Sequence, residues 1–381
     1  MSTSNASTPI DGNGGTIFVA LELSRRTWLV TMHSADRDRI SRHKLEGGDH
    51  IGLLALIERV RARAARALGT VPAVVSCYEA GYDGFWLHRL LAAAGITNHV
   101  LDPASIAVEQ RGRRSKTDRI DGEQLLRTLM AYCRGEPRVA RIVRVPSAEQ
   151  EDARRDTREQ DRLTKEQGAH INRIKGLLRL LGLPVGNPRR RDWLMWLAQQ
   201  RDWQGQAVPP RLLAELKREH ARLMLVGEQL AALKKQPAPA TPAAAEMARR
   251  RDLLLRVKAL GPAFSRILTN EAFYKDFSNR REVGGYFGLG GSPWRSGQTD
   301  REQGISKAGN RRARHAAVEL AWLWLKHQPD SDLSRWFRAR TESASKRIKR
   351  IAIVALARKL MVALWRYLTT GLIPAGAVLK A

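Results

Sequence analysis

The sequence is short of cysteine, of acidic residues and of long apolar runs, and each shortage excludes a class of protein. Its 381 residues include only two cysteines, Cys77 and Cys133, which are too few for a disulfide framework or a cysteine-rich zinc site. No apolar run reaches the roughly 18 uncharged residues that a membrane-spanning helix needs. Residues 1–15 lack the basic and apolar blocks of a signal peptide and are predicted to be a disordered leader. We therefore expect a cytoplasmic protein without a membrane anchor.

Positive charge is what the chain has in excess. It carries 66 lysines and arginines against 38 aspartates and glutamates, a formal net charge of +28 at pH 7. Such an excess destabilises a compact state by self-repulsion, so a polyanionic partner is expected. In a cytoplasmic protein the polyanion that fits is nucleic acid.

Residues 16–146 are predicted to form a mixed α/β domain. Two apolar segments joined by a tight polar turn are typical of a β-hairpin, and later apolar segments alternate with amphipathic helices. Hairpin strands followed by alternating strands and helices imply a mixed sheet with helices on its faces. The strands are expected at residues 16–23, 27–34, 39–45, 72–79 and 97–103.

The middle of the chain, residues 147–236, is predicted to be an elongated helical region. Leu216, Leu223 and Leu230 recur every seven residues, a spacing that fits a coiled-coil seam and makes self-association plausible. The segment that follows, PAPATPAAAE at 237–246, indicates a Pro/Ala linker and the clearest domain boundary of the chain.

Residues 247–381 are predicted to form a compact helical domain. A long loop rich in glycine and polar residues is expected at 286–315, and a basic amphipathic helix that packs on the core is expected at 346–368. The fold class is therefore α/β plus α: a mixed-sheet domain, a helical coiled-coil middle and a helical C-terminal domain.

Four acidic residues suggest a site in the first domain. Asp118 and Asp121 are three residues apart at a predicted helix start, so their side chains project from one face. Glu22 lies in the first strand and Glu79 ends a later one, positions that suit a ribonuclease H-like site. Clustered carboxylates repel one another unless a cation joins them, and hard divalent cations prefer oxygen ligands. Mg²⁺ fits, and Mn²⁺ accepts the same ligands.

The basic residues just before this helix start leave two interpretations open. In one, Asp118 caps the helix and Asp121 forms an ordinary ion pair with a neighbouring base. In the other, the acids hold a metal ion that the bases help to present to a phosphate. The bases predicted to contact nucleic acid here are Arg111, Arg113, Arg114 and Lys116.

The order of these segments resembles a known family. ELSR at 22–25, EAGY at 79–82 and KTDRID at 116–121 are similar to the motifs Gly-Ile-Asp-Val-Ser-Lys, Glu-x-Thr-Gly-x-Tyr and Lys-Thr-Asp-x-x-Asp-Ala. These motifs belong to the DEDD transposases of bacterial insertion sequences, the family numbered one-ten, which includes Piv-type invertases. YFGLGGSPWRSG at 286–297 and GISKAGNRRAR at 304–314 resemble its Gly-Leu-x-Pro…Ser-Gly…Ser-Lys-x-Gly-Asn-x-x-x-Arg signature. The resemblance covers nearly the whole chain.

Two departures from the family pattern stand out. The first acid is Glu22 where the family usually has aspartate, and the extra methylene moves its carboxylate by on the order of 1 Å. The loop before Pro293 also has extra residues, which leaves its register open. An inactive relative that only binds nucleic acid is therefore an alternative to an active enzyme.

Ser296 draws its importance from the resemblance. A lone serine in a polar loop is ordinarily a turn residue, and nothing nearby in the sequence shows a general base. The resemblance implies that Ser296 is the nucleophile that attacks a DNA phosphate, with a covalent phosphoserine link as the intermediate. A metal-dependent junction-resolving nuclease that uses water is the alternative enzyme.

The SKAGNRRAR segment is predicted to contact phosphate. Gly309 precedes a helix start, where backbone N–H groups favour an anion, and arginines follow it; a solubilising basic helix start is the simpler alternative. The residues predicted to bind nucleic acid here are Lys307, Asn310, Arg311, Arg312 and Arg314.

The resemblance also implies the wider assignment. Residues 16–146 would be a RuvC-like (ribonuclease H-like) catalytic domain with Glu22, Glu79, Asp118 and Asp121 binding Mg²⁺, and residues 247–381 a transposase domain. The enzyme would recombine element ends with target DNA, use a structured bridge RNA as a guide, and assemble as a dimer or tetramer near the bacterial nucleoid.

Overall fold

The computed structural model describes residues 15–37, 39–81, 84–106, 118–137, 139–235, 242–296 and 299–380. The chain divides into two compact units, Met1–Val145 and Pro146–Ala381. The second unit contains both the predicted helical middle and the predicted C-terminal domain.

The first unit is built on a five-stranded mixed sheet, as predicted. The strand order is β3-β2-β1-β4-β5. β1, β2 and β3 are antiparallel neighbours, whereas β4 runs parallel to β1 and β5 parallel to β4. The strands are β1 (Thr16–Glu22), β2 (Thr27–Ser34), β3 (Arg39–Glu46), β4 (Ala73–Glu79) and β5 (Thr97–Leu101).

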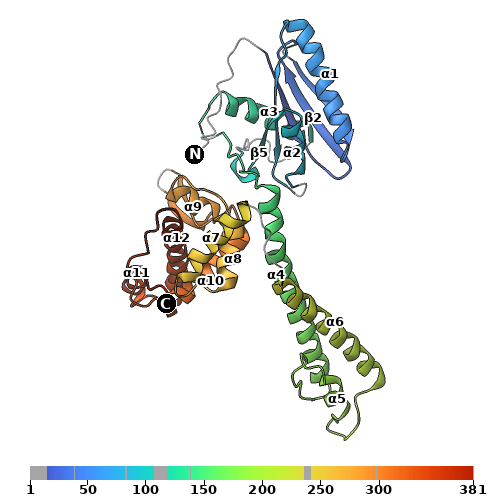
Figure 1. Ribbon diagram of the computed structural model, residues 1–381, viewed down its shortest axis with the longest axis vertical. Helices are drawn as coiled ribbons and strands as arrows, with labels where there is room; N and C mark the ends of the chain where they lie inside the picture. The colour runs from blue at the N-terminus through green and yellow to red at the C-terminus, as the bar shows by residue number, and fades with distance from the viewer. Residues whose placement is uncertain are drawn as a thin grey trace. The chain divides into compact units, whose positions relative to one another are not determined.

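Helices cover both faces of this sheet because successive residues of a buried strand point to opposite sides. In β1, Val19 and Leu21 join the core formed with helices α1 and α2, whereas Ala20 joins the core formed with α3. Figure 1 shows α1, α2 and α3 around the sheet. The helices are α1 (His50–Leu68), α2 (Trp86–Ala93) and α3 (Asp118–Cys133), with a short 3₁₀ turn, η1, at Pro103–Ser105.

The second unit begins with a helical hairpin. α4 (Ala148–Arg179) and α6 (Pro210–Lys235) lie side by side, with the short α5 (Trp193–Ala198) between them in the chain (Figure 1). The heptad positions Leu216 and Leu223 are buried in a core shared with α4 and α5. The seven-residue spacing therefore reflects packing within one chain, at least over these two turns.

The rest of the second unit is a helical domain around one apolar core. Its helices are α7 (Pro242–Arg256), α8 (Pro262–Glu271), α9 (Arg280–Tyr286), α10 (Arg311–His327), α11 (Asp332–Thr341) and α12 (Lys346–Thr370). α12 packs on the core through one face, as expected, with Leu356, Leu360 and Leu364 fully buried. α7 begins inside the segment predicted as a linker, because proline is favoured in a helix's first turn and alanine favours its continuation.

The prediction of a loop at 286–315 is wrong in part. Two antiparallel strands, β6 (Gly291–Ser296) and β7 (Thr299–Ile305), form a hairpin within it. The polar, glycine-containing sequence concealed this hairpin, since two strands can pair through backbone hydrogen bonds alone without an apolar face. No described helix is long and apolar enough to cross a membrane.

Candidate functional site

Glu22 and Glu79 end two neighbouring parallel strands. The register of β1 and β4 pairs Leu21 with Tyr78, so the next residue along each strand is one of the two acids. Glu22 is half-buried and Glu79 is exposed. Because residues in register on parallel strands point to the same face, the two acids share one face of the sheet at its carboxyl-terminal edge.

That face is the one covered by α3. Ala20 and Cys77, which precede the two acids by two residues, both join the core formed with α3. The Cys77 thiol lies 3.8 Å from the carbonyl oxygen of Leu125 in that helix. By strand alternation Glu22 and Glu79 therefore point to the side of the sheet on which α3 packs.

The first turn of α3 is fitted closely against β2. Gly122 lies so near this strand that an added Cβ would be 2.6 Å from Thr31 Oγ1 and 3.4 Å from Leu29 Cδ2. Leu29 is in turn the register partner of Glu22. The half-buried Asp121, one residue before Gly122, is thus carried by a helix start that lies over the strand neighbouring Glu22.

An ion pair between Arg42 of β3 and Glu123 ties the same turn of α3 to the edge of the sheet. Asp118 is the first residue of α3, one turn before Asp121. The structure thus brings Glu22, Glu79 and the helix start that bears the two aspartates to one face of the sheet. The bases predicted beside them, Arg111, Arg113, Arg114 and Lys116, lie outside the described residues.

The described acids on this face are oxygen donors, but they do not by themselves form a complete metal site. Searched over the described residues, the chain holds no group of three or more His, Cys, Asp or Glu side chains placed to bind a metal ion. Glu22, Glu79 and Asp121 offer carboxylate oxygens, the ligands that Mg²⁺ and Mn²⁺ prefer. Burial, and then the nearby Cys133 and Glu79, raise the pKa of the Cys77 thiol well above its ordinary value, so Cys77 offers no thiolate.

Ser296 lies at the turn end of the β6–β7 hairpin. It is the last residue of β6 and pairs with Thr299, the first residue of β7. At the other end of the hairpin Gly291 pairs with Ile305. The hairpin therefore places Ser296 at its tip and connects directly, through β7, to the SKAGNRRAR segment.

The segment after the hairpin is packed tightly on the end of α9. Gly309 has φ +89°, and an added Cβ would be 2.3 Å from the carbonyl oxygen of Tyr286. Gly288, with φ +62°, has similarly no room for a Cβ, which would be 2.0 Å from the carbonyl oxygen of Ala308. Lys307 is exposed and adopts φ +55°, which is uncommon outside glycine.

Asn310 and Arg312 form contacts within the protein. The Asn310 side chain caps α10, and its Nδ2 donates to Glu271 Oε2 at 3.0 Å. Arg312 lies 3.3 Å from Glu271 and 2.8 Å from Asp161 of α4. Arg158 of α4 donates two hydrogen bonds to the Glu271 carboxylate, at 2.9 and 3.1 Å. We call these five residues the Glu271 network.

Glu271 is fully buried at the centre of this network. Burial raises its pKa, but the hydrogen bonds from Arg158 and Asn310 and the positive charges of Arg158 and Arg312 outweigh it, so the pKa is lowered overall. No sequence pattern marks this residue, because a single glutamate in LTNEAFY looks like an ordinary helix-end acid. Of the five residues predicted to contact nucleic acid here, Asn310 and Arg312 are thus engaged internally.

The other three differ in exposure. Lys307 and Arg311 are exposed. Arg314 is half-buried and its guanidinium donates to the carbonyl oxygen of Phe287 at 3.3 Å. Burial, and then the neighbouring Arg311, lower the pKa of Arg314. Lys307 and Arg311 are therefore the members of this group best placed to meet an anion.

Comparison with known proteins identifies the class of protein as a transposase. Residues 251–335 match the model of the Transposase IS116/IS110/IS902 family. The chain is 44% identical to y4rJ, a proposed transposase of Sinorhizobium fredii, over 96% of this chain and 95% of the relative. It is 26% identical to a second proposed transposase of that organism, y4qE, over 87% of this chain and 77% of the relative. The chain belongs to the IS110 family of transposases.

Proposed function

We propose that this transposase cleaves and rejoins DNA strands by metal-assisted phosphoryl transfer through a covalent link to Ser296. The observation that supports this most is the shared register of Glu22 and Glu79 at the ends of parallel strands, with the start of α3 packed beside them. The order of three antiparallel strands followed by two parallel ones also favours a RuvC-like, ribonuclease H-like domain.

The residues that would hold Mg²⁺ or Mn²⁺ are Glu22, Glu79, Asp118 and Asp121. A bound divalent ion supplies a Lewis acid that stabilises negative charge on phosphoryl oxygens. The chain itself would supply these oxygen ligands from a sheet edge and from a helix start that packs on that sheet.

Ser296 would act as the nucleophile. Its hydroxyl oxygen would form a bond to phosphorus and give its proton to solvent water. The bond from phosphorus to one DNA sugar oxygen would break, and that oxygen would take a proton from water. The phosphodiester energy is kept in the Ser296–DNA link, which a different strand can then attack. Hydrolysis by water would lose that energy, which is why recombination favours the covalent route.

The test is a covalent-adduct assay with labelled DNA of the element ends and Mg²⁺. After denaturation we expect DNA attached to wild-type protein and none attached to Ser296→Ala. Ser343→Ala, which changes an exposed serine between α11 and α12 of the same unit, is the matched control and keeps the adduct. Cleavage that persists in Ser296→Ala would support the alternative, a nuclease that uses water.

A second comparison tests the carboxylates and the inactive-relative alternative together. Glu22→Gln should abolish the adduct, whereas Glu22→Asp, which restores the family's usual residue, should keep it or increase it. Adduct formation and Mn²⁺ binding that are unaffected by Glu22→Gln and Asp121→Asn would count against the metal site. No adduct with wild-type protein or with Glu22→Asp would favour a relative that only binds nucleic acid.

A structured bridge RNA and a homo-oligomer, dimer or tetramer, complete the proposal. The net charge of +28 supports a second nucleic-acid partner besides DNA. RNA binding is tested by purifying the protein with the transcript of its flanking DNA and sequencing the retained RNA. The oligomeric state is tested by light scattering of the purified complex; a monomer that still forms the adduct would count against assembly.

A further inference from the structure

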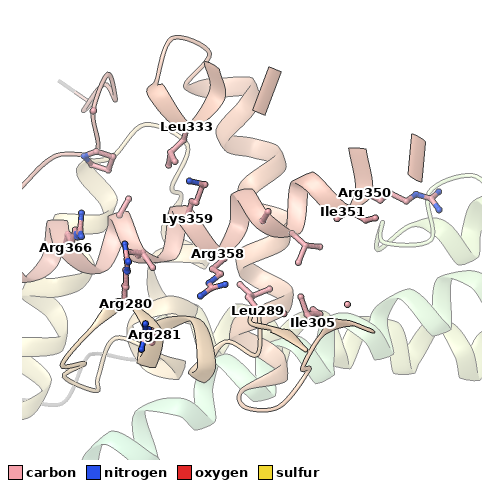
Figure 2. Close-up of a pocket in the computed structure, with 18 of the residues that line it drawn as sticks. Arg280, Arg281, Leu289, Ile305, Leu333, Arg350, Ile351, Arg358, Lys359 and Arg366 are labelled. Atoms are coloured by element: carbon pink, nitrogen blue, oxygen red, sulfur yellow. The ribbon is translucent and has the colours of Figure 1, made fainter. Parts of the chain in front are cut away.

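A basic groove runs along α12 in the second unit. It encloses about 1320 Å³ and is bounded by α12, the start of α9, the base of the β6–β7 hairpin and residues 372–375. Figure 2 shows Arg350 and Arg366 at opposite ends of the α12 stretch that lines it. We call this cavity the α12 groove.

The charge of the α12 groove is of one sign. Its described lining includes eight basic residues and no acidic one, and α12 itself contains seven lysines and arginines without an aspartate or glutamate. Cations gathered in one concave site repel one another and concentrate anions. The basic residues are Arg280, Arg281, Lys307, Arg347, Arg350, Arg358, Lys359 and Arg366.

These cations are spaced along a line. From Arg347 to Arg366 the helix rises about 28 Å at 1.5 Å per residue, so the charges suit an extended polyanion better than a single phosphate. Within the described part of the chain, no ion pair engages the side chains of Arg347, Arg350 or Arg366. Their charge is therefore left for a partner.

The groove also has apolar lining residues that are partly open to solvent, near both ends of α12. Ile351 is 61% exposed, Leu372 64% and Ile373 42%. A duplex offers charged phosphates to a surface like this and keeps its bases stacked inside. An unpaired strand can place phosphates on the basic side chains and base faces on the exposed apolar ones, so the combination favours a single strand.

The described lining also favours deoxyribose over ribose. It contains no Asp, Glu, Asn, Gln, Ser or Thr side chain that could accept a hydrogen bond from a 2′-hydroxyl. RNA recognition commonly uses that hydroxyl as both donor and acceptor, whereas the arginines and lysines of the groove can only donate to it. The lining thus fits a deoxyribose backbone.

We propose that the α12 groove binds a single-stranded DNA segment and leads it to the hairpin that carries Ser296. Gly291 and Ile305, the register pair at the base of that hairpin, line the groove together with Lys307. This proposal rests on the proposed function, because it assumes that the strand runs toward Ser296. Binding to the groove is nevertheless measured without any cleavage step.

The experiment measures the affinity of the full chain for a labelled 12-nucleotide single-stranded DNA by fluorescence anisotropy across a salt series. The test variant combines Arg347→Gln, Arg350→Gln and Arg366→Gln. Losing three phosphate contacts should lower the salt slope by about 2 and weaken binding on the order of 100-fold at 0.1 M salt. Duplex DNA and RNA of the same sequence should show a much smaller difference between variant and wild type.

The matched control removes the same charge from the helical hairpin, with Lys175→Gln, Lys217→Gln and Arg218→Gln, all exposed positions. We expect it to change single-strand affinity less than threefold. Equal effects of the two triple variants would overturn the proposal, because binding would then follow net charge alone. A groove-dependent preference for RNA or duplex, or a change in oligomeric state with unaltered DNA affinity, would overturn it as well.

A second measurement uses the wild-type protein, so that it does not depend on folding of a variant. A photoreactive single-stranded DNA is cross-linked and the modified peptides are sequenced. Cross-links within 346–375 or 280–291 support the groove, whereas cross-links confined to other segments overturn it. If the groove binds DNA while no Ser296 adduct forms, the proposed chemistry fails and the groove stands.

Discussion

Replacing Glu271 by glutamine removes one negative charge from the fully buried centre of the Glu271 network. The glutamine keeps the shape of the side chain but cannot balance Arg158 and Arg312. The side chain of Arg312 is only 19% exposed and that of Arg158 is 57% exposed. Arg158 can therefore regain water, whereas Arg312 keeps only the partly exposed Asp161 as a counter-charge.

The expected loss of stability follows from this difference in exposure between the two arginines. Leaving a buried charge without its partner destabilises a protein by about 3–5 kcal/mol, so we expect Glu271→Gln to lower the free energy of unfolding by about 3 kcal/mol. Arg158→Gln removes a mostly exposed partner and should cost about 1 kcal/mol. Each variant removes one charge from the network, so a larger loss of stability in Glu271→Gln would show the effect of burial.

Urea unfolding followed by tryptophan fluorescence measures both variants. With a slope near 3 kcal/mol/M, Glu271→Gln should shift the midpoint by about 1 M. Because the folded-state pKa of Glu271 is lowered from 4.5, its stabilising effect is present above that value and is lost as the pH falls below it. The difference between wild type and variant should therefore narrow in acid. A Glu271→Gln shift no larger than that of Arg158→Gln, or one independent of pH, would refute the reasoning.

The remaining predictions concern single sites. Gly122→Ala should destabilise the first unit by about 1–3 kcal/mol through its clash with Thr31, and Thr31→Ala should relieve it in a double-mutant thermal-unfolding cycle; an additive pair would contradict the close fit. Glu246, whose pKa the Arg249 hydrogen bond lowers to about 2, is 42% exposed in its ion pair. Glu246→Gln should therefore cost under about 1 kcal/mol at pH 7, an effect lost as the pH falls from 4.5 toward 2, as pH-dependent unfolding of both proteins would show. Gly309→Ala should lower the melting temperature by more than Gly69→Ala, since both have positive φ but only Gly309 lacks room for a Cβ.

The sheet was predictable because its strands obey simple periodicity. β1 and β4 are apolar segments of about the right length with turn residues at their ends, and their parallel pairing follows from the helix between them. Placing Glu22 and Glu79 at strand ends therefore needed only the sequence. Their register, and the contact of Gly122 with β2, required the folded structure because they depend on helix packing.

The second unit shows where the sequence falls short. The β6–β7 hairpin has no alternating apolar face, so its backbone pairing leaves no pattern. Asn310 and Arg312 look like phosphate ligands in SKAGNRRAR, yet their partners Glu271 and Asp161 lie about 40 and 150 residues earlier. Polar contacts between distant segments depend on tertiary packing, which residue spacing cannot reveal.

The continuity of α4 has a mechanical consequence. In its first half, Arg158 is bound to Glu271 at the end of α8 and Asp161 to Arg312 at the start of α10. Its last turns, around Ile174 and Leu178, are packed into the apolar core shared with α6. These attachments are about 25 Å apart on an unbroken helix. A displacement of the tip of the helical hairpin would therefore be transmitted along α4 to the N-terminal cap of α10 and to the segment that follows the Ser296 hairpin.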